Sequence, residues 1–268
     1  MANTASARIA DLKPGDGYVQ SFARGLEVIR SFSAKAPSQT LTEVAGRAGL
    51  SRAGARRILL TLEALGYVRS DGKLFSLSPR ILDLGFSYLS SMPIWNLAEP
   101  VMEALVAQVH ESSSAAVLDG TDIVYVLRVP TRKIMSISLG VGSRLPAYCT
   151  SMGRILLSAL AQDDLMALLR ASDLAARTKT TLTDAKEIAA KVAQARRQGW
   201  SLVNQELEEG LISLAAPIVD RSGQMVAALN ISGQANRTSA RVMQDTMLEP
   251  LLEAARTISR QLDGTTVD

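Results

Sequence analysis

Two short helices in succession, each with its own N-cap signal, are the feature that most constrains the fold of this chain. The run Thr40–Glu43 is a capping box, in which a threonine hydroxyl caps the helix and a glutamate follows three residues later. Gly49 predicts the end of this helix, because glycine tolerates the left-handed backbone of a helix C-terminus. Ser51 is the N-cap of the next helix. Two short helices joined by a glycine-containing turn predict a helix-turn-helix.

Apolar residues at helical spacing support both helices and an earlier one over 18–32. We expect one apolar face at Val19, Phe22, Leu26, Ile29 and Phe32, a second at Leu41, Val44, Ala45 and Ala48, and a third at Ala55, Ile58, Leu59, Leu62 and Leu65. Two alternating segments, 67–69 and 74–77, flank Asp71-Gly72, a dipeptide typical of tight hairpin turns. The pattern predicts a two-stranded wing with Lys73 at its tip.

The helix after Ser51 carries basic residues at its N-terminal end, opposite or beside its apolar face. In a helix-turn-helix, the first residues of the second helix meet base edges in the major groove. Arginine suits both phosphate and guanine, and small side chains let the backbone come close. We therefore predict that double-stranded DNA is contacted by Thr42, Ser51, Arg52, Ala53, Gly54, Arg56, Arg57 and Lys73. The alternative is a small helical domain whose arginines are only solvated.

The distribution of charge favours a polyanionic partner for the first third of the chain. Residues 1–80 contain 12 Lys and Arg against 6 Asp and Glu, a net charge of +6. Residues 81–268 contain 17 against 20, a net charge of −3. The positive charge therefore gathers in the segment that is predicted to meet DNA.

Length and composition limit the number of domains and the compartment in which the protein is expected. The 268 residues, 47% hydrophobic and 21% charged, suffice for one large or two smaller globular domains. No apolar run reaches the ~20 residues of a membrane helix, the first residues lack the apolar core of a secretory signal, and one cysteine gives no internal disulfide. We expect a cytoplasmic protein without a membrane partner. The predicted parts are a flexible arm over 1–17, a winged helix-turn-helix domain over 18–79, a linker helix over 80–92 and a second domain over 93–268.

The second domain alternates strand and helix signals. Helices are expected over 95–110, 151–160, 165–169, 184–198 and 239–262, and strands over 114–118, 123–129, 133–139, 200–203, 211–219 and 224–232. Antiparallel strands with helices outside predict an α+β fold of the GAF- or PAS-like sensor type.

The sequence lacks the usual motifs of catalysis. One histidine, His110, and one cysteine, Cys149, preclude a multi-histidine or zinc cluster. A P-loop, a dinucleotide fingerprint and a G-x-S-x-G turn are all absent. Glu206, Glu208 and Glu209 are expected in a solvated loop. We predict no catalytic residue, no metal and no cofactor.

The segments RLPAYCTSMGRILLSAL and QGWSLVNQELEEGLISLAAPIVDRSGQMVAALNISG resemble the IclR family of transcriptional regulators, over roughly residues 18–262. The segments LFSLSPRILDLGFSYLSS and SSSAAVLDGTDIVYVLRVPTRKIMSISLGVGSRLPAYCTSMGR are similar to the Pca/Pob branch. The resemblance implies that the domain over 93–268 binds a small carboxylate, an aromatic acid or an intermediate of the β-ketoadipate pathway. It also implies a homodimer or a dimer of dimers on a palindromic operator.

The family pattern carries over to an effector pocket lined by Ile134, Ile137, Leu145, Ser151, Met152, Val203, Ser213, Asn230 and Ser232. Glyoxylate-sensing members resemble this chain but carry an acid and a cysteine where Val203 and Ser213 stand, which argues against a small keto acid. The alternative is an enzyme with a DNA-binding head, or a DNA-binding protein without a ligand.

The residues themselves support such a pocket. A helix that opens at Ser151 presents free N–H groups and a positive dipole end, which favour an anion. Asn230 and Ser232 are two residues apart on a strand and therefore share one face. The alternative is that Ser151 only caps its helix and that Asn230 and Ser232 bond neighbouring strands. Arg144 either pairs with a carboxylate or points to solvent, and solvent is the preferred interpretation.

Overall fold

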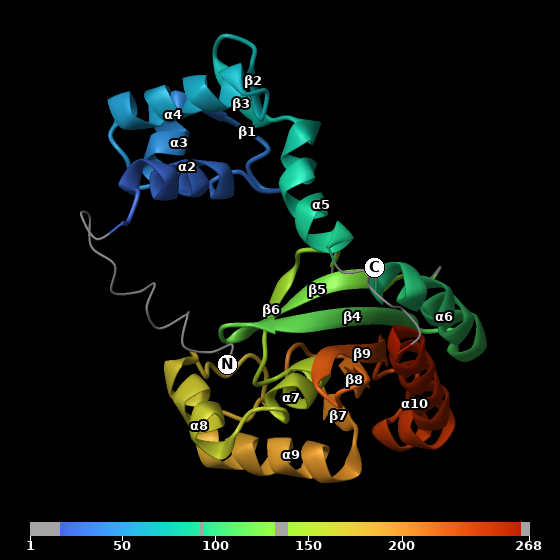
Figure 1. The fold of residues 1–268 in the computed structure, drawn as a ribbon. Coiled ribbons are helices and arrows are strands. Elements are labelled where there is room, and N and C mark those ends of the chain that lie inside the picture. The colour runs from blue at the N-terminus through green and yellow to red at the C-terminus, as the bar shows by residue number, and fades with distance from the viewer. Residues whose placement is uncertain (1–16, 92–93, 132–138, 264–268) are drawn as a thin grey trace. The chain divides into compact units, whose positions relative to one another are not determined.

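The computed structural model describes residues 17–91, 94–131 and 139–263 (Figure 1). The chain divides into two compact units, one ending at Ser91 and the other beginning at Met92. The predicted arm over 1–17 and the predicted strand over 133–139 lie outside the described residues, except for Gly17 and Leu139.

The first unit is a helix-turn-helix with a small sheet. Its elements are α2 (Gln20–Arg30), β1 (Ser38–Thr40), α3 (Leu41–Arg47), α4 (Arg52–Ala64), β2 (Val68–Ser70) and β3 (Leu74–Leu77). The three strands pair antiparallel in the order β1-β3-β2. The predicted wing therefore gains a third strand, which the sequence did not indicate because β1 has only three residues and runs directly into the capping box.

Local capping explains why the two central helices begin where they do. The Glu43 carboxylate accepts a hydrogen bond from the Thr40 N–H at 2.7 Å, and the Glu43 N–H donates to the Thr40 hydroxyl at 3.4 Å. The bond from the Thr40 backbone, followed by that from its hydroxyl, lowers the pKa of Glu43. Ser51 Oγ accepts from the Gly54 N–H at 3.1 Å. Gly49 has φ +63°, the left-handed conformation predicted for the turn.

The core of the first unit contains Val28, Phe32, Val44, Leu59, Leu62 and Val68. One prediction about these apolar faces was wrong. Leu65 is 53% exposed, because it forms the C-cap of α4 and no longer continues the buried face. On α2, Val28 is fully buried while Phe22 is 68% exposed, so the apolar face predicted from Val19 to Leu26 points away from this unit's core.

The last part of the first unit, from Pro79 to Ser90, is helical, as the sequence predicts. A short 3-10 turn over Pro79–Ile81 leads into α5 (Leu82–Ser90). Ser78 caps this turn by accepting a hydrogen bond from the Arg80 N–H at 3.2 Å. Large apolar side chains of α5 are exposed, among them Leu82 and Phe86.

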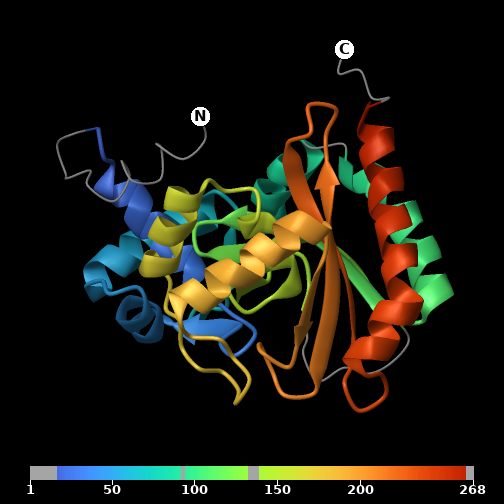
Figure 2. The ribbon, with the colours of Figure 1, turned by 90° about the horizontal axis from the view of Figure 1, so that it is seen from below.

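The second unit is built on one six-stranded antiparallel sheet in the order β6-β5-β4-β9-β8-β7 (Figure 2). Its strands are β4 (Ser112–Asp119), β5 (Asp122–Val129), β6 (Arg144–Pro146), β7 (Ser201–Asn204), β8 (Leu211–Val219) and β9 (Met225–Gln234). The sequence predicted all of these except β6, a three-residue edge strand. The α+β prediction is confirmed.

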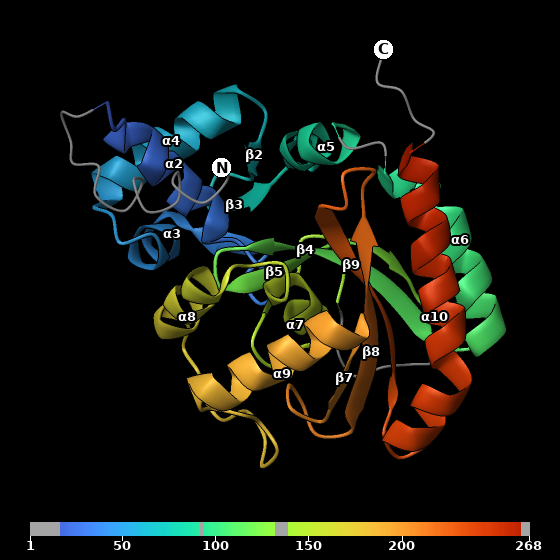
Figure 3. The same cartoon turned by 60° about the horizontal axis from the view of Figure 1, so that its bottom comes forward.

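Helices cover both faces of this sheet (Figure 3). α6 (Ile94–Val109) and α10 (Ala240–Asp263) pack together on one face. α7 (Ser151–Leu157) lies against the other face, α9 (Ala185–Gln198) packs against α7, and α8 (Gln162–Ala171) packs against α9. Among the described helices, none is long and apolar enough to cross a membrane.

All seven residues of α7 are buried, so this helix is the centre of the second unit's core. Gly153 makes close packing possible, because a Cβ at this position would lie 2.0 Å from the Ala147 carbonyl oxygen. Arg154 is buried too, and its guanidinium pairs with the Glu206 carboxylate at 2.6 Å. The predicted solvated loop is therefore wrong for Glu206, which is drawn inside to neutralise a buried cation.

Candidate functional site

The N-terminal end of α4 presents a basic surface to solvent. Arg52, Ala53, Arg56 and Arg57 are exposed, whereas Ala55 is buried against the core. The first turn of α4 contains no acidic residue. Arginines thus project from a helix end that is itself positively polarised, an arrangement suited to phosphate and to base edges.

The other residues predicted to contact DNA differ in how freely they can act. Thr42 is exposed in the first turn of α3. The Ser51 hydroxyl is occupied as the N-cap of α4, and Gly54, half-buried, supplies the N–H that it accepts. Ser51 and Gly54 can therefore shape the start of α4 and let its backbone come close to DNA, but the Ser51 hydroxyl is already in use.

Lys73 is held at the tip of the wing by a structured turn. The Asp71 carboxylate accepts hydrogen bonds from the Lys73 N–H at 2.9 Å and from the Leu74 N–H at 2.7 Å. These bonds, that from Leu74 first, lower the pKa of Asp71. Gly72 has φ +96°, which the turn requires. The Lys73 side chain is exposed beyond this turn.

A small cavity lies between α7 and the sheet in the second unit. It is lined by Tyr125, Leu145, Cys149, Thr150, Ser151, Met152, Val203, Leu207, Leu211, Ser213, Asn230 and Ser232. Seven residues predicted from the family pattern therefore come together here from β6, α7, β7, β8 and β9. The other two, Ile134 and Ile137, lie outside the described residues. The cavity volume is about 20 Å³, and a single water needs ~10–15 Å³.

The start of α7 is capped by Thr150, not by Ser151. Thr150 Oγ1 accepts a hydrogen bond from the Gly153 N–H at 3.1 Å and donates to the Pro146 carbonyl at 3.1 Å. Ser151 is 1% exposed, and its Oγ has no hydrogen-bond partner among the described residues. The alternative in which Ser151 merely caps its helix is thus wrong. Buried hydroxyls are rarely left unpaired, so Ser151 offers a polar contact to whatever fills the cavity.

Asn230 and Ser232 do bond their neighbours. Asn230 Oδ1 accepts from the Ser114 N–H at 3.0 Å, and Asn230 Nδ2 donates to Ser232 Oγ at 2.9 Å. The alternative interpretation, in which Asn230 and Ser232 bond neighbouring residues of the sheet, is therefore correct for these hydrogen bonds. Both residues still line the cavity, and these bonds fix the orientation of the Asn230 amide.

The sequence missed five of the lining residues, namely Tyr125, Cys149, Thr150, Leu207 and Leu211. Two of these, Tyr125 and Cys149, carry ionisable groups. Burial raises the pKa of Tyr125 to about 12 and that of Cys149 to about 11. Both groups are therefore neutral near pH 7 and add no negative charge to the cavity. The alternation along β5, which places Ile123 and Tyr125 on one face, was the available sequence signal for Tyr125.

Arg144 does not line this cavity. Its guanidinium donates to Asp119 Oδ2 at 2.6 Å and to Asp122 Oδ2 at 3.2 Å. The hydrogen bond that Arg144 donates to Asp119 raises the pKa of Arg144; desolvation opposes this effect and the bond to Asp122 adds to it. Arg144 is exposed, in agreement with the preferred interpretation, and these two carboxylates also bind it to the β4–β5 hairpin.

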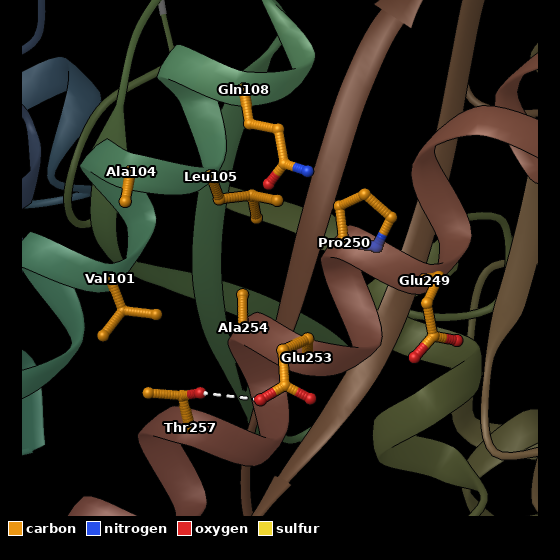
Figure 4. Close-up of a pocket in the computed structure, with 9 residues that line it drawn as sticks. All are labelled: Val101, Ala104, Leu105, Gln108, Glu249, Pro250, Glu253, Ala254 and Thr257. Atoms are coloured by element: carbon orange, nitrogen blue, oxygen red, sulfur yellow. Dashed lines mark hydrogen bonds between the residues drawn. The ribbon is translucent and has the colours of Figure 1, made fainter.

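Larger hollows occur elsewhere in the second unit. One of about 400 Å³ lies between α6 and α10 and is lined by Val101, Ala104, Leu105, Gln108, Glu249, Pro250, Glu253, Ala254 and Thr257 (Figure 4). Its charged groups are two carboxylates, which pair with Arg256 and Arg260. Another of about 640 Å³ lies among α9, β7 and α10. The acidic groups of the first hollow disfavour a carboxylate ligand, despite the greater volume.

No group of three or more potential metal ligands occurs among the residues that the structure describes. The geometry therefore consists of an exposed basic helix end in one unit and a small polar-lined cavity in the other.

Both units match models of one family. The IclR helix-turn-helix model matches residues 21–72, and the model of the C-terminal domain of the bacterial transcriptional regulator IclR matches residues 86–260. The chain therefore belongs to the IclR family and is a transcriptional regulator. Family membership, rather than any missing catalytic cluster, supports the prediction that the protein is not an enzyme.

Two curated relatives are similar to this chain over most of its length. The chain is 45% identical to the Pca regulon regulatory protein of Pseudomonas putida over 248 residues, covering 92% of this chain and 85% of that protein. It is 34% identical to the p-hydroxybenzoate hydroxylase transcriptional activator of Acinetobacter baylyi, covering 88% and 89%.

Two solved structures share the fold. A protein from Rhodococcus sp. RHA1, assigned to the transcriptional regulators, is 48% identical, with a TM-score of 0.82 over 91% of this chain and 98% of that one. An IclR homologue from Microbacterium hydrocarbonoxydans, solved with 4-hydroxybenzoate, is 24% identical, with a TM-score of 0.81 over 91% and 100%. The latter comparison supports the fold alone.

Proposed function

We propose that this protein controls genes for the breakdown of aromatic acids, and that a small carboxylate effector bound beside α7 changes its affinity for DNA. One observation carries the effector part: the buried hydroxyl of Ser151, which has no hydrogen-bond partner among the described residues, lines a cavity together with Asn230 and Ser232. The names of the Pseudomonas and Acinetobacter relatives support the choice of pathway. The candidates are 4-hydroxybenzoate, protocatechuate, catechol-derived muconate and β-ketoadipate.

The small size of the cavity suggests how an effector could change the conformation of the protein. At about 20 Å³ it has room for about one water, so a benzoate enters only if the walls move apart. A ligand shifts a conformational equilibrium only through unequal affinity for the two arrangements. An effector that fits the expanded arrangement alone meets this condition, and the displaced walls include α7 and the ends of β7 and β8.

The DNA part of the proposal rests on the exposed end of α4. Arg52, Arg56 and Arg57 contact phosphates and base edges in the major groove, and Lys73 contacts a neighbouring phosphate. The proposed parts are the winged domain over 18–79, the linker helix over 80–92 and the effector domain over 93–268. As a regulator of bacterial genes, the protein acts in the cytoplasm.

A homodimer, or a dimer of dimers, follows from the same proposal. The exposed apolar side chains of Phe22 and Leu26 on α2, and of its N-cap residue Val19, pair with those of a second copy. A twofold arrangement of two recognition helices requires two half-sites, so the operator is palindromic.

The experiment selects operators from a random duplex library with the full-length protein and then measures DNA affinity with and without each candidate acid. We expect palindromic sequences and an affinity that falls steeply with salt. The variant with Arg52, Arg56 and Arg57 all changed to alanine loses DNA binding but keeps acid binding. A selection that yields no enriched sequence contradicts the DNA part.

A ligand-independent DNA-binding protein is the second candidate, and the narrow cavity favours it. It predicts the same operator affinity in the presence of every acid, together with no thermal shift. An acid that raises the melting temperature and changes operator affinity excludes this candidate.

A further inference from the structure

Arg128 on β5 belongs to the same surface as the cavity, although neither the family pattern nor the cavity lining includes it. The strand register pairs Arg128 with Ser114, Ser114 with Asn230, and Asn230 with Ala215. Residues directly opposite one another in antiparallel strands project from the same face. Because Asn230 lines the cavity, Arg128 projects from the cavity face of the sheet.

Hydrogen bonds connect Arg128 to the cavity wall. Its Nη1 donates to Ser114 Oγ at 3.3 Å, and the Ser114 N–H holds the Asn230 side-chain oxygen at 3.0 Å. The guanidinium therefore lies over the strand next to Asn230, and neighbouring strands are ~4.7–4.9 Å apart. Its charge also acts on the Tyr125 phenol, which lines the cavity.

Arg128 has no carboxylate partner among the described residues, unlike two other arginines of this unit. The buried Arg154 pairs with Glu206, and the exposed Arg237 pairs with Glu111. For Arg128, which is half-buried, the one hydrogen bond to the described part of the chain goes to a serine hydroxyl. A partly desolvated cation without a counter-charge attracts an anion, and a guanidinium binds a carboxylate through two parallel hydrogen bonds.

We propose that Arg128 binds the carboxylate of the effector, an inference that rests on the proposed effector site beside α7. The ring then lies against Tyr125 and Leu145, and a ring hydroxyl reaches Ser151. A full positive charge on Arg128 outweighs the roughly half charge at the start of α7, where Thr150 already occupies one N–H group.

The test measures binding of 4-hydroxybenzoate and protocatechuate, and of their neutral amides, to full-length wild type and to Arg128→Gln by calorimetry. We expect wild type to prefer each acid over its amide by at least tenfold. Arg128→Gln loses at least tenfold in acid affinity and binds acid and amide about equally. Arg128→Lys, which keeps the charge but not the paired hydrogen bonds, falls between them.

Controls separate this role from a structural one. Arg170→Gln removes an exposed arginine of α8 in the same unit and leaves acid binding unchanged. A structural role for Arg128 weakens acid and amide equally, and that result overturns the proposal. Equal acid affinity in wild type and Arg128→Gln overturns it while leaving the effector site intact. Wild type that binds none of the candidate acids overturns both proposals.

Discussion

Helices α4 and α7 begin with the same local chemistry in opposite surroundings. Each has a hydroxyl N-cap, Ser51 or Thr150, and each has glycine three residues later that donates its N–H to that cap at 3.1 Å. α4 opens toward solvent, whereas every residue of α7 is buried. One N-terminus is thus available to a large polyanion outside, and the other only to a small ligand inside.

The difference shows what burial adds to a shared motif. The residue after the glycine is Ala55 in α4 and Arg154 in α7, and both are buried. In α4 the alanine simply packs against the core. In α7 the arginine needs the Glu206 carboxylate, and Gly153 is needed because the backbone of Ala147 lies against it.

Breaking the buried ion pair is expected to have the largest effect. Glu206→Gln leaves Arg154 buried without a counter-charge and should cost about 3–5 kcal/mol of unfolding free energy. Glu27→Gln breaks the exposed pair between Glu27 and Arg30 of α2 and should cost less than about 1 kcal/mol. Urea unfolding of both variants measures the difference. Equal losses would mean that burial does not distinguish these pairs.

The two glycines give the next largest contrast. In Gly153→Ala the new Cβ lies 2.0 Å from the Ala147 carbonyl oxygen, so the backbone must shift, at a cost of about 1–3 kcal/mol or more. In Gly54→Ala the nearest atom is Ser51 Oγ at 3.2 Å, and the better helix propensity of alanine, about 1 kcal/mol, offsets this contact. Thermal unfolding should show a clear loss for the first variant only.

The positions that precede the two N-caps, Cys149 before Thr150 and Leu50 before Ser51, can be compared by the reactivity of a thiol at each. Burial raises the pKa of Cys149 from 9.0 to about 11, which leaves about 100-fold less thiolate at pH 8, because each pKa unit is a factor of ten. Leu50→Cys in a Cys149→Ala background places a thiol at the equivalent, half-exposed position. We expect iodoacetamide to modify the latter at least about 100-fold faster than Cys149.

The same shift has a consequence for stability, with a definite sign. The folded-state pKa of Cys149 lies above its ordinary value, so the unfolded chain releases this proton first. The contribution is fully present below about pH 8 and is lost as pH rises from 9 to about 11. A Cys149→Ala variant should lack this component of the alkaline decline, and an unchanged decline would contradict the assignment.

The smallest contrast is between the caps themselves. Ser51→Ala removes one exposed capping bond and should cost about 1 kcal/mol or less. Thr150→Ala also removes the bond to the Pro146 carbonyl in a buried site and should cost about 2 kcal/mol. Denaturant midpoints of the two single variants test the order, and a larger loss for Ser51→Ala would reverse it.

Local signals were sufficient for much of the fold. The capping box, the glycine at the turn and the Asp71-Gly72 hairpin predicted the first unit because each acts over three or four residues. Local sequence patterns likewise predicted five of the six strands that the structure describes in the second unit. The edge strands β1 and β6 were missed, since each has three residues and, unlike the equally short β2, no hairpin turn beside it that the sequence marked.

The site needed more than local signals. The family pattern named seven cavity residues, yet Tyr125 joins them only through the pairing of β5 with β4 and of β4 with β9. Likewise, nothing near Glu206 in the sequence indicates that it enters the core, because its partner lies 52 residues earlier.

The sequence alone determined where helices and strands begin, which helix end carries the arginines, and to which family the chain is similar, because these depend on neighbouring residues or on motif identity. Only the tertiary structure decided which N-terminus is buried, which arginine lacks a carboxylate and how little space remains beside Ser151. Those properties depend on packing and on charges brought together from distant strands, where one residue's neighbours in space are not its neighbours in the chain.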